Sequence, residues 1–147
     1  MSMYPEMMVM PMREELTELG IVELRSAEEV HSFIQGSQGT VMVIVNSICG
    51  CAAGRMRPAV ALAMKNAALP VKSASVFAGQ DQEATAAARS YFSGQPASSP
   101  SIGLLRAGEL VYFMPRQRIE SREAPAIAAD LKAAFDELCG ANAAATR

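Results

Sequence analysis

The stretch VMVIVNSICGCAAGRMRPA, residues 41–59, decides the fold. It opens with five consecutive apolar residues, Val41-Met42-Val43-Ile44-Val45, most of them β-branched. Such a run is typical of a strand buried on both faces, as in a parallel or mixed sheet. An alanine-rich segment that favours helix follows from Ala52. The stretch therefore predicts a buried strand, a loop and a helix in immediate succession.

The predicted loop contains two cysteines, Cys49 and Cys51, with Gly50 between them. The start of a helix presents unsatisfied backbone N–H groups and the positive end of the helix dipole. Both features favour a thiolate over a thiol, so this position predicts redox chemistry. Asn46, which interrupts the apolar run, belongs to the same predicted active-site loop.

The spacing of the two cysteines restricts any disulfide between them. A disulfide needs Cα atoms roughly 4.4–6.8 Å apart with converging Cβ vectors. Residues two apart point to nearly opposite sides in a helix, and lie at the long end of this range in a strand. Gly50 can adopt the unusual backbone conformation that closure requires, because positive φ costs glycine almost nothing. We therefore expect a strained, easily reduced bridge, or a mixed disulfide with a substrate.

Two other interpretations of the cysteine pair stay open. The cysteines can be inert small hydrophobic residues, or they can bind a soft metal such as Cu(I). A closed zinc site needs about four ligands, and only Cys139 and His31 are available besides the pair. Arg55 and Arg57, early in the predicted helix, could bring positive charge near the sulfurs.

Composition and charge exclude several classes of protein. The 147 residues, half of them hydrophobic, are enough for one domain with a substantial core. The net charge of −2 and the lack of a basic patch argue against nucleic acid and anionic membranes as partners. No apolar run is long enough to span a membrane. Three cysteines in a chain without an export signal predict a cytoplasmic location.

We expect a single domain over residues 1–147, with an N-terminal helical extension at 1–19 and a disordered tail at 141–147. The extension is rich in methionine, and we expect Pro11 near the start of its helix. Its apolar face, which includes Met8 and Met12, is expected to pack on the domain or against a second copy. A homodimer is therefore possible.

The remaining patterns complete the predicted fold. They indicate strands at 21–24, 71–77, 101–106 and 109–114. They indicate helices from 27 to the glycines at 36–39, from the cysteine motif to about 68, at 82–92 and at 124–139. Expected helix caps are Ser26 with Glu29, Asp81, and Gly140. This order predicts an α/β fold of thioredoxin-like type, a central mixed sheet with helices on both faces and an extra N-terminal helix.

The sequence resembles the bacilliredoxin family, small bacterial thioredoxin-fold proteins with a Cys-Gly-Cys motif. The matching stretches are spread over nearly the whole chain: NSICGCAAG at 46–54, VFAGQD at 76–81, YF at 91–92, SSPS at 98–101, FMPR at 113–116 and AAFD at 133–136. The nine-residue string around the cysteines is the most specific of them.

This resemblance implies a thiol–disulfide oxidoreductase that acts through Cys49 and Cys51. Cys49 would attack a mixed disulfide on a client protein and take over a low-molecular-weight thiol, bacillithiol or a similar molecule. Cys51 would be the resolving or auxiliary thiol. Ser99 and Pro100 would form a cis-proline loop whose backbone binds substrate. The small thiol would be the co-substrate, with no bound cofactor.

Other functions and roles are weighed against this one. Weak disulfide isomerase or reductase activity is an alternative within enzymes, and a non-catalytic Cu(I)-binding protein is one outside them. The strand at 41–45 carries no acidic residue to shuttle protons, unlike ordinary thioredoxins. Cys139 is interpreted as packing at a helix end, although a redox or dimer-linking role is open. His31 is interpreted as a structural histidine.

Overall fold

A computed structural model describes residues 2–139 of the chain. A five-stranded mixed sheet, in the order β1-β3-β2-β4-β5, forms its centre. Its strands are β1 (Val22–Glu23), β2 (Thr40–Asn46), β3 (Lys72–Phe77), β4 (Ser101–Arg106) and β5 (Glu109–Met114). The helices are α1 (Glu6–Thr17), α2 (Ala27–Gln35), a π-helical segment (Ala52–Met56), α3 (Arg57–Ala63), α4 (Gln82–Arg89), α5 (Arg116–Glu120) and α6 (Ala124–Cys139).

Strand β2 is the centre of the sheet, as the apolar run predicted. All seven of its residues are buried. It pairs in parallel with β3, where Val43 lies opposite Ala74, and antiparallel with β4, where Val43 lies opposite Gly103. Because β2 has neighbours on both edges and helices over both faces, apolar side chains are needed at every position. The predicted hairpin of β4 and β5 is also present, with positive φ at Ala107 and Gly108 in its turn.

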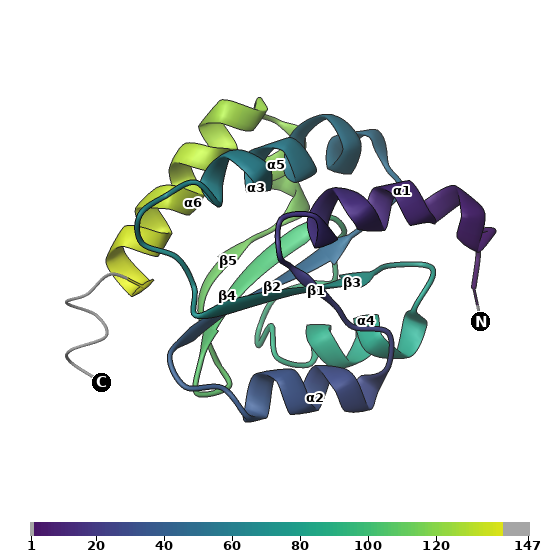
Figure 1. Ribbon diagram of the computed structural model, residues 1–147, viewed down its shortest axis with the longest axis horizontal. Helices are drawn as coiled ribbons and strands as arrows, with labels where there is room; N and C mark the ends of the chain where they lie inside the picture. The colour runs from purple at the N-terminus through teal and green to yellow at the C-terminus, as the bar shows by residue number, and fades with distance from the viewer. Residues whose placement is uncertain (1, 140–147) are drawn as a thin grey trace.

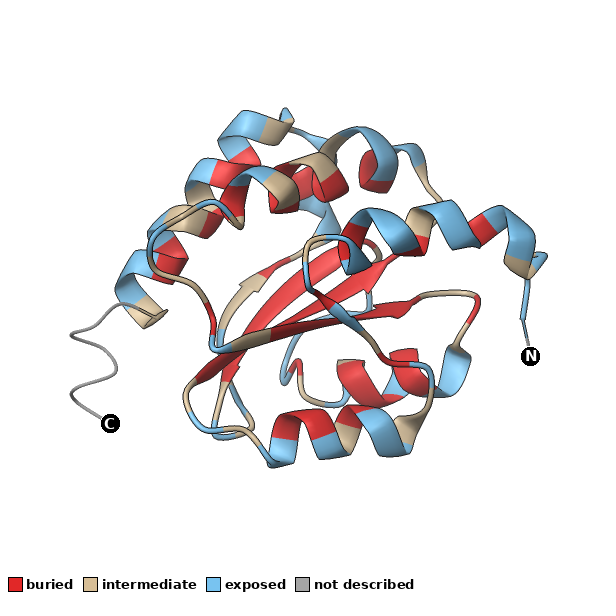
Figure 2. Cartoon of the chain, viewed as in Figure 1, coloured by how far each residue is buried: buried red, intermediate tan, exposed pale blue. Residues whose placement is uncertain are grey.

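Helices cover both faces of the sheet, which gives the molecule three layers (Figure 1). Helices α1, α3, α5 and α6 lie on one face, and α2 and α4 lie on the other. The buried residues line the strands and the sides of the helices that are turned toward them (Figure 2). The first core includes Met56, Val60, Leu131 and Phe135, and the second includes Val30, Ile34, Ala88 and Phe92. The predicted mixed sheet with helices on both faces is therefore confirmed.

Several predicted helix boundaries were wrong. Helix α3 ends at Ala63 rather than near residue 68, and α4 ends at Arg89 rather than at Phe92. The five-residue helix α5 was not predicted at all. Helix α2 begins as predicted, with the Ser26 hydroxyl accepting a hydrogen bond from the Glu29 N–H at 3.1 Å. The predicted cap Gly140 and the tail at 141–147 lie outside the described residues.

Helix α1 contains Pro11 in its interior, which corrects the prediction that this proline lies near the helix start. Proline removes the N–H that would bond to the carbonyl of Met7, four residues earlier. Met7 is exposed, so water can satisfy that carbonyl. The helix therefore continues through the proline because burial of its other face outweighs one lost hydrogen bond.

The buried face of α1 matches the apolar face that the sequence suggested only in part, because Leu16 of that face is buried but its methionines are not. Val9, Arg13 and Leu16 are buried, whereas Met8 is exposed. Met12 is half-buried. The prediction that Met8 packs on the domain was therefore wrong, and a dimer through this face stays a prediction.

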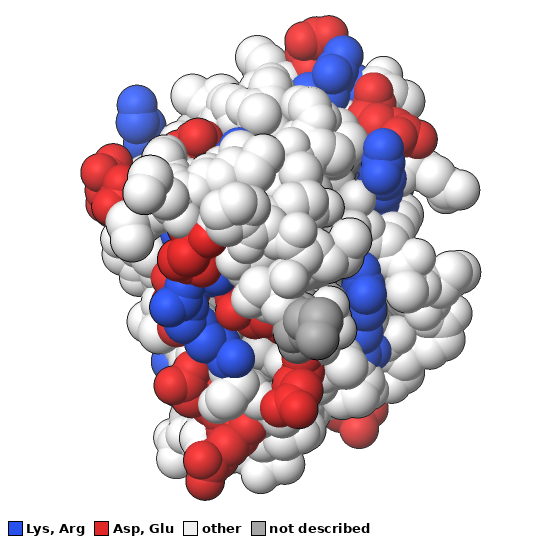
Figure 3. All heavy atoms as spheres, turned by 90° about the vertical axis from the view of Figure 1, so that its right-hand side faces the viewer, with Lys and Arg blue, Asp and Glu red and all other residues white. Residues whose placement is uncertain are grey.

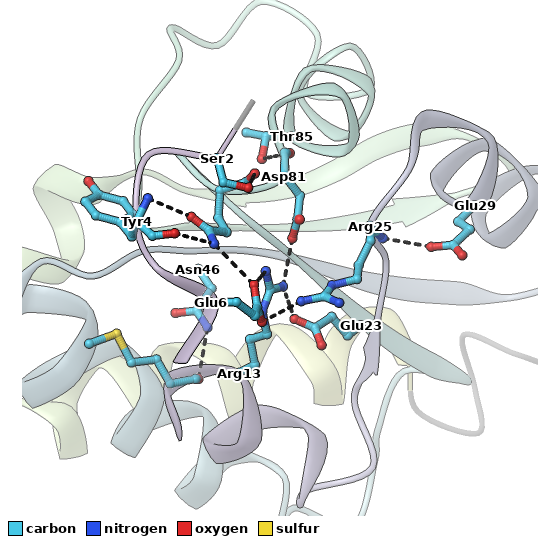
Figure 4. A network of polar contacts seen from close by, with 12 residues as sticks. Ser2, Tyr4, Glu6, Arg13, Glu23, Arg25, Glu29, Asn46, Asp81 and Thr85 are labelled. Atoms are coloured by element: carbon cyan, nitrogen blue, oxygen red, sulfur yellow. Dashed lines mark hydrogen bonds and ion pairs between the residues drawn. The ribbon is translucent and has the colours of Figure 1, made fainter. Parts of the chain in front are cut away.

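Arg13 joins α1 to the rest of the fold through three carboxylates (Figure 4). Its side chain is 3% exposed and forms ion pairs with Glu6 at 2.8 Å, with Asp81 at 2.7 Å and with Glu23. Arg25 adds a second positive charge, 2.6 Å from Glu6. The hydrogen bond from Arg13 holds the pKa of Glu6 below its usual value, although burial acts in the opposite direction. The network thus connects α1, β1 and the start of α4.

The sequence suggested that Asp81 caps α4, but its side chain belongs to this network instead. It occupies the N-cap position, but its side chain makes no capping hydrogen bond. Its carboxylate points to Arg13, and its backbone carbonyl accepts a hydrogen bond from the Thr85 hydroxyl at 2.8 Å. A buried guanidinium attracts a carboxylate more strongly than a backbone N–H does, which explains the choice.

No helix in the described part of the chain combines the length and the apolar character needed to cross a bilayer.

Replacement of Arg13 tests the network. We expect Arg13→Leu to lower the free energy of unfolding by about 3 kcal/mol, near the lower end of the range for breaking a buried ion pair, since the remaining carboxylates keep some access to water. Arg25→Leu is the matched control, and removal of its exposed pair should cost less than about 1 kcal/mol. Urea unfolding measures both, and equal losses would contradict the assignment.

Acid should weaken the same network. Because the folded state lowers the pKa of Glu6, its ionised form adds stability above the unfolded pKa of about 4.3. That contribution is lost as the pH falls through the lower, folded-state value. The stability difference between wild type and Arg13→Leu should therefore be larger at neutral pH than in acid below about pH 4. Urea unfolding at the two pH values measures it, and a difference independent of pH would contradict the role of Glu6.

Candidate active site

The two cysteines of the Cys-Gly-Cys motif lie where β2 leaves the sheet and the following helix begins. The carbonyl of Cys49 accepts hydrogen bonds from the N–H groups of Ala52 at 3.0 Å and Ala53 at 3.2 Å, so Cys49 stands at the helix N-terminus. Cys51 lies in the first turn. Cys49 is half-buried and Cys51 is buried, at 8% exposure. One sulfur is therefore more accessible than the other.

The surroundings of the two sulfurs shift their pKa values in opposite directions. Burial raises the pKa of Cys49, but hydrogen bonds from the Cys51 thiol, the Ser47 hydroxyl and the backbone N–H groups of Ala52 and Cys51 outweigh it and lower the pKa. The Ser47 Oγ lies 3.4 Å from the Cys49 sulfur. Burial and the neighbouring Cys49 raise the pKa of Cys51. The outer sulfur thus ionises first, while the inner one stays protonated and donates to it.

Gly50 has helical backbone in this dithiol form and does not have positive φ. A Cβ atom built on it would meet nothing within 4 Å. The reduced form therefore has no need of glycine at this position. The conformational freedom predicted for Gly50 is needed only when a bridge between Cys49 and Cys51 forms.

Asn46 fixes the loop that carries the cysteines, although it makes no hydrogen bond to either sulfur. Its Oδ1 accepts hydrogen bonds from the Ser47 N–H and from Arg57, both at 2.9 Å. Its Nδ2 donates to the carbonyl of Met12 in α1 at 3.2 Å. Asn46 therefore connects β2, α1 and α3 directly beneath the predicted nucleophile.

The two arginines that could bring positive charge near the sulfurs bond to other groups instead. Arg57 is 2% exposed and bonds to Asn46, to the carbonyl of Ser47 and to Glu15. Arg55 donates to the carbonyl of Arg122 at 3.0 Å. The positive charge that acts on both sulfurs instead comes from Arg116 at the start of α5.

A pocket of about 290 Å³ opens beside Cys49. Its lining combines Ser47 and Ile48 with Tyr4 from the N-terminal segment, Arg89 from α4, Ser99 and Arg116. The Ser99–Pro100 peptide bond is cis, as the resemblance implied, and Ser99 lines the pocket while Pro100 is buried behind it. The carboxyl ends of β2 and β3 and the start of α1 point to this side of the molecule, where charged side chains surround an uncharged area (Figure 3).

Tyr4, Arg89 and Arg116 were not recognised from the sequence as site residues. Ser47 could have been, because it follows the buried strand and stands two residues before Cys49. The other three come from distant segments, and no local pattern connects them to the cysteines.

His31 and Cys139 lie away from this pocket. The Nδ1 atom of His31 is 2.7 Å from the Tyr91 hydroxyl, on the face of the sheet covered by α2. Cys139 ends α6 and packs against the first core. The preceding carbonyl, of Leu138, accepts a hydrogen bond from Thr40, at the opposite end of β2 from Asn46. Seven strand residues span about 20 Å, so Cys139 is remote from Cys49.

Among the described residues, no group of three or more His, Cys, Asp or Glu side chains is arranged to hold a metal ion. A zinc site that combines the cysteine pair with His31 and Cys139 is thus not formed.

Comparison with known proteins settles the family. Residues 4–139 match the family model described as disulphide isomerase. A bacilliredoxin of Koribacter versatilis is 57% identical over 143 residues, which cover 97% of this chain and 99% of the relative. The chain belongs to the bacilliredoxin family. A bacilliredoxin of Staphylococcus aureus is 48% identical, over 92% of this chain and 95% of the relative.

Solved structures confirm the predicted thioredoxin fold. The thioredoxin of Fasciola hepatica superposes with a TM-score of 0.57, at 18% identity, over 80% of this chain and 99% of that protein. Chlamydomonas reinhardtii thioredoxin f2 gives a TM-score of 0.55, at 16% identity, over 80% of this chain and 95% of that protein. Fold and family membership together support a thiol–disulfide oxidoreductase.

The contrast between the sulfurs leads to a testable prediction. Alkylation of Cys49 by iodoacetamide should reach half its maximal rate at a pH below about 8.5, the value of an unperturbed thiol. Ser47→Ala should move that midpoint upward, because it removes a hydrogen bond that stabilises the thiolate. Mass spectrometry at each pH identifies the alkylated cysteine. Preferential labelling of Cys51 would show that the assignment of the two sulfurs is wrong.

Proposed function

We propose that the protein removes a low-molecular-weight thiol, bacillithiol or a similar molecule, from mixed disulfides on client proteins. The observation that carries the proposal is the difference between the two sulfurs. Cys49 is half-buried at the edge of a pocket and has a lowered pKa, whereas Cys51 is buried and has a raised pKa. A catalytic cysteine needs to be both accessible and readily ionised, and Cys49 is the more exposed sulfur and the one whose pKa is shifted toward ionisation.

The proposed reaction begins with attack by the Cys49 thiolate on the small-thiol sulfur of the client's mixed disulfide. A new S–S bond forms between Cys49 and the small thiol, the bond to the client breaks, and the client cysteine leaves as a thiolate. One disulfide replaces another, so no external electrons are needed. The client is thereby restored, and the small thiol stays on Cys49.

Two routes can then remove the small thiol from Cys49, and the second leaves a Cys49–Cys51 disulfide that two further thiol molecules must reduce before the next cycle. A second molecule of the small thiol can attack the adduct and leave as a symmetrical disulfide. Alternatively, Cys51 attacks Cys49, releases the small thiol and forms the Cys49–Cys51 bridge. Cys51 is protonated and its attack requires Gly50 to leave its helical conformation, so we expect the adduct to persist. Cys139 is too far away to take part.

This proposal requires no bound cofactor, with the small thiol as the co-substrate and thiolated proteins as partners. We place the reaction in the cytoplasm, where a reducing environment keeps cysteines as thiols. Ser99 and Pro100 would bind the client, since Ser99 lines the pocket beside Cys49 and Pro100 follows it.

Disulfide isomerase activity on protein disulfides is a second candidate, favoured by the description of the matching family model. It uses the same attack by Cys49, but the mixed disulfide then joins the enzyme to a protein chain instead of a small thiol.

Mass spectrometry of the products distinguishes the two activities. Incubation with a bacillithiolated client should give an adduct of one small thiol on Cys49, with release of the free client thiol. Cys49→Ala should abolish the transfer, and Cys51→Ser should retain it. Turnover of scrambled protein disulfides without any small-thiol adduct would favour the isomerase. Retention of Cu(I) without thiol exchange would favour the metal-binding alternative.

Replacement of Gly50 tests the second route. Gly50→Ala fits the reduced form and favours its helical backbone, but it opposes positive φ by roughly 1–2 kcal/mol. We expect the reduction potential of the Cys49–Cys51 bridge to rise by about 20–40 mV, since 30 mV corresponds to about 1.4 kcal/mol. Equilibration with a thiol redox buffer measures the potential. An unchanged value would mean that the bridge closes with Gly50 still helical.

A further inference from the structure

Arg89 is the one pocket residue whose charge the described structure leaves unbalanced. It ends α4 and lines the pocket that also holds Cys49. Its Nε is buried and has no hydrogen-bond partner in the structure. Within residues 2–139, its one hydrogen bond runs from an Nη to the carbonyl of Ser98, at 3.3 Å. No carboxylate of the described residues lies within ion-pair distance of it.

The other arginines of the described chain are better satisfied. Seven of them form ion pairs: Arg13, Arg25, Arg55, Arg57, Arg116, Arg118 and Arg122. Arg106, which also lacks a carboxylate, donates to the carbonyl of Leu138 at 2.8 Å and to the Thr40 hydroxyl at 3.3 Å. Burial of a guanidinium with an idle N–H costs free energy unless an anion compensates it. Arg89 therefore lacks an anionic partner among the described residues, and the pocket that it lines has room for one.

Arg116 brings a second guanidinium to the same pocket. It donates to the carbonyl of Ser99 at 3.3 Å, one residue from the carbonyl that Arg89 contacts. Residues 98–99 thus connect both arginines, and the two side chains and Cys49 line one cavity. A small anion in this cavity would meet positive charge while its sulfur faces Cys49.

We propose that Arg89, together with Arg116, holds a carboxylate of the small thiol that is transferred to Cys49. The inference rests on the proposed function and specifies its substrate class, a thiol that carries an anionic group. A pocket of about 290 Å³ fits a small molecule, being near the lower end of the roughly 300–1,000 Å³ found for ligand sites. An acidic side chain of the client is the competing source of the carboxylate.

During transfer the carboxylate keeps its charge and takes no part in bond exchange. The Cys49 thiolate bonds to the sulfur of the small thiol, and the partner sulfur leaves with the electron pair of the broken S–S bond. Arg89 is therefore a positioning residue that acts on the substrate and not on the thiolate.

Two matched disulfides test the proposal on the full-length Cys51→Ser protein, in which the adduct on Cys49 accumulates. One is the symmetrical disulfide of 3-mercaptopropionate, and the other is that of the neutral 3-mercaptopropionamide. Each rate is divided by the rate of the same disulfide with a free cysteine derivative. We expect the carboxylate probe to be favoured by about tenfold, as a charge-assisted hydrogen bond provides.

Variants at Arg89 should change that preference alone. Arg89→Gln should lower the ratio severalfold and leave only the share that Arg116 provides, and Arg89→Lys should retain more of it. Arg106→Gln, which removes the same charge at the far end of β4, should keep the full preference. The pH profile of Cys49 alkylation should be the same in Arg89→Gln as in its parent, which separates positioning of the substrate from activation of the sulfur.

The outcomes separate this inference from the proposed function. Failure of both disulfides to react with Cys49 would overturn thiol exchange itself. Equal reaction of both probes, with Arg89 intact, would overturn the carboxylate site and leave exchange standing. If a preference arises only when acidic residues flank the thiolated cysteine of a client peptide, the carboxylate belongs to the client and the proposal is wrong.

Discussion

The hydrogen bonds of Asn46 at the end of β2 are the constraint on which the site depends. Its amide oxygen accepts from Ser47 and Arg57, and its amide nitrogen donates to Met12. These bonds stop the buried strand at a fixed point and hold Ser47 in place. The Ser47 hydroxyl can then reach the Cys49 sulfur. The lowered pKa of Cys49 thus depends on how β2 ends, and also on the position of Cys49 at the start of the helix.

Burial of the Arg57 guanidinium costs free energy, and the hydrogen bonds around it explain how the fold compensates that cost. A guanidinium that is 2% exposed is expensive unless its N–H groups are satisfied, and here Glu15, Asn46 and the Ser47 carbonyl satisfy them. The positive charge therefore serves the loop backbone and not the sulfur. Thiolate stabilisation is left to short-range hydrogen bonds and to the exposed Arg116, whose effect solvent and salt weaken.

The features predicted correctly from the sequence are those that local pattern determines. The uninterrupted apolar run of β2 required burial on both faces, and the turn at Ala107-Gly108 required a hairpin. The Cys-Gly-Cys motif was located correctly at a strand-to-helix junction because both flanking segments have a strong propensity.

The errors arose where tertiary contacts outweigh local preference. Pro11 lies within α1 because Val9, Arg13 and Leu16 bury the opposite face, and no local rule reveals that benefit. The Asp81 carboxylate bonds to Arg13, 68 residues away, instead of capping α4. The pocket arginines come from α4 and α5, and only the fold brings them beside the cysteines.

The N-terminal segment is more than an extension of the domain, because it forms one wall of the site. Gln80 holds Tyr4 by two hydrogen bonds, from the Tyr4 N–H at 3.0 Å and to its carbonyl at 2.8 Å. Gly79, with φ of +83°, leaves room for the Tyr4 ring, which lies 3.2 Å from where a Cβ would stand. Tyr4 lines the pocket, and the Arg13 network fixes the helix that follows it. The same ion pairs that stabilise the fold therefore also determine the shape of the space beside Cys49.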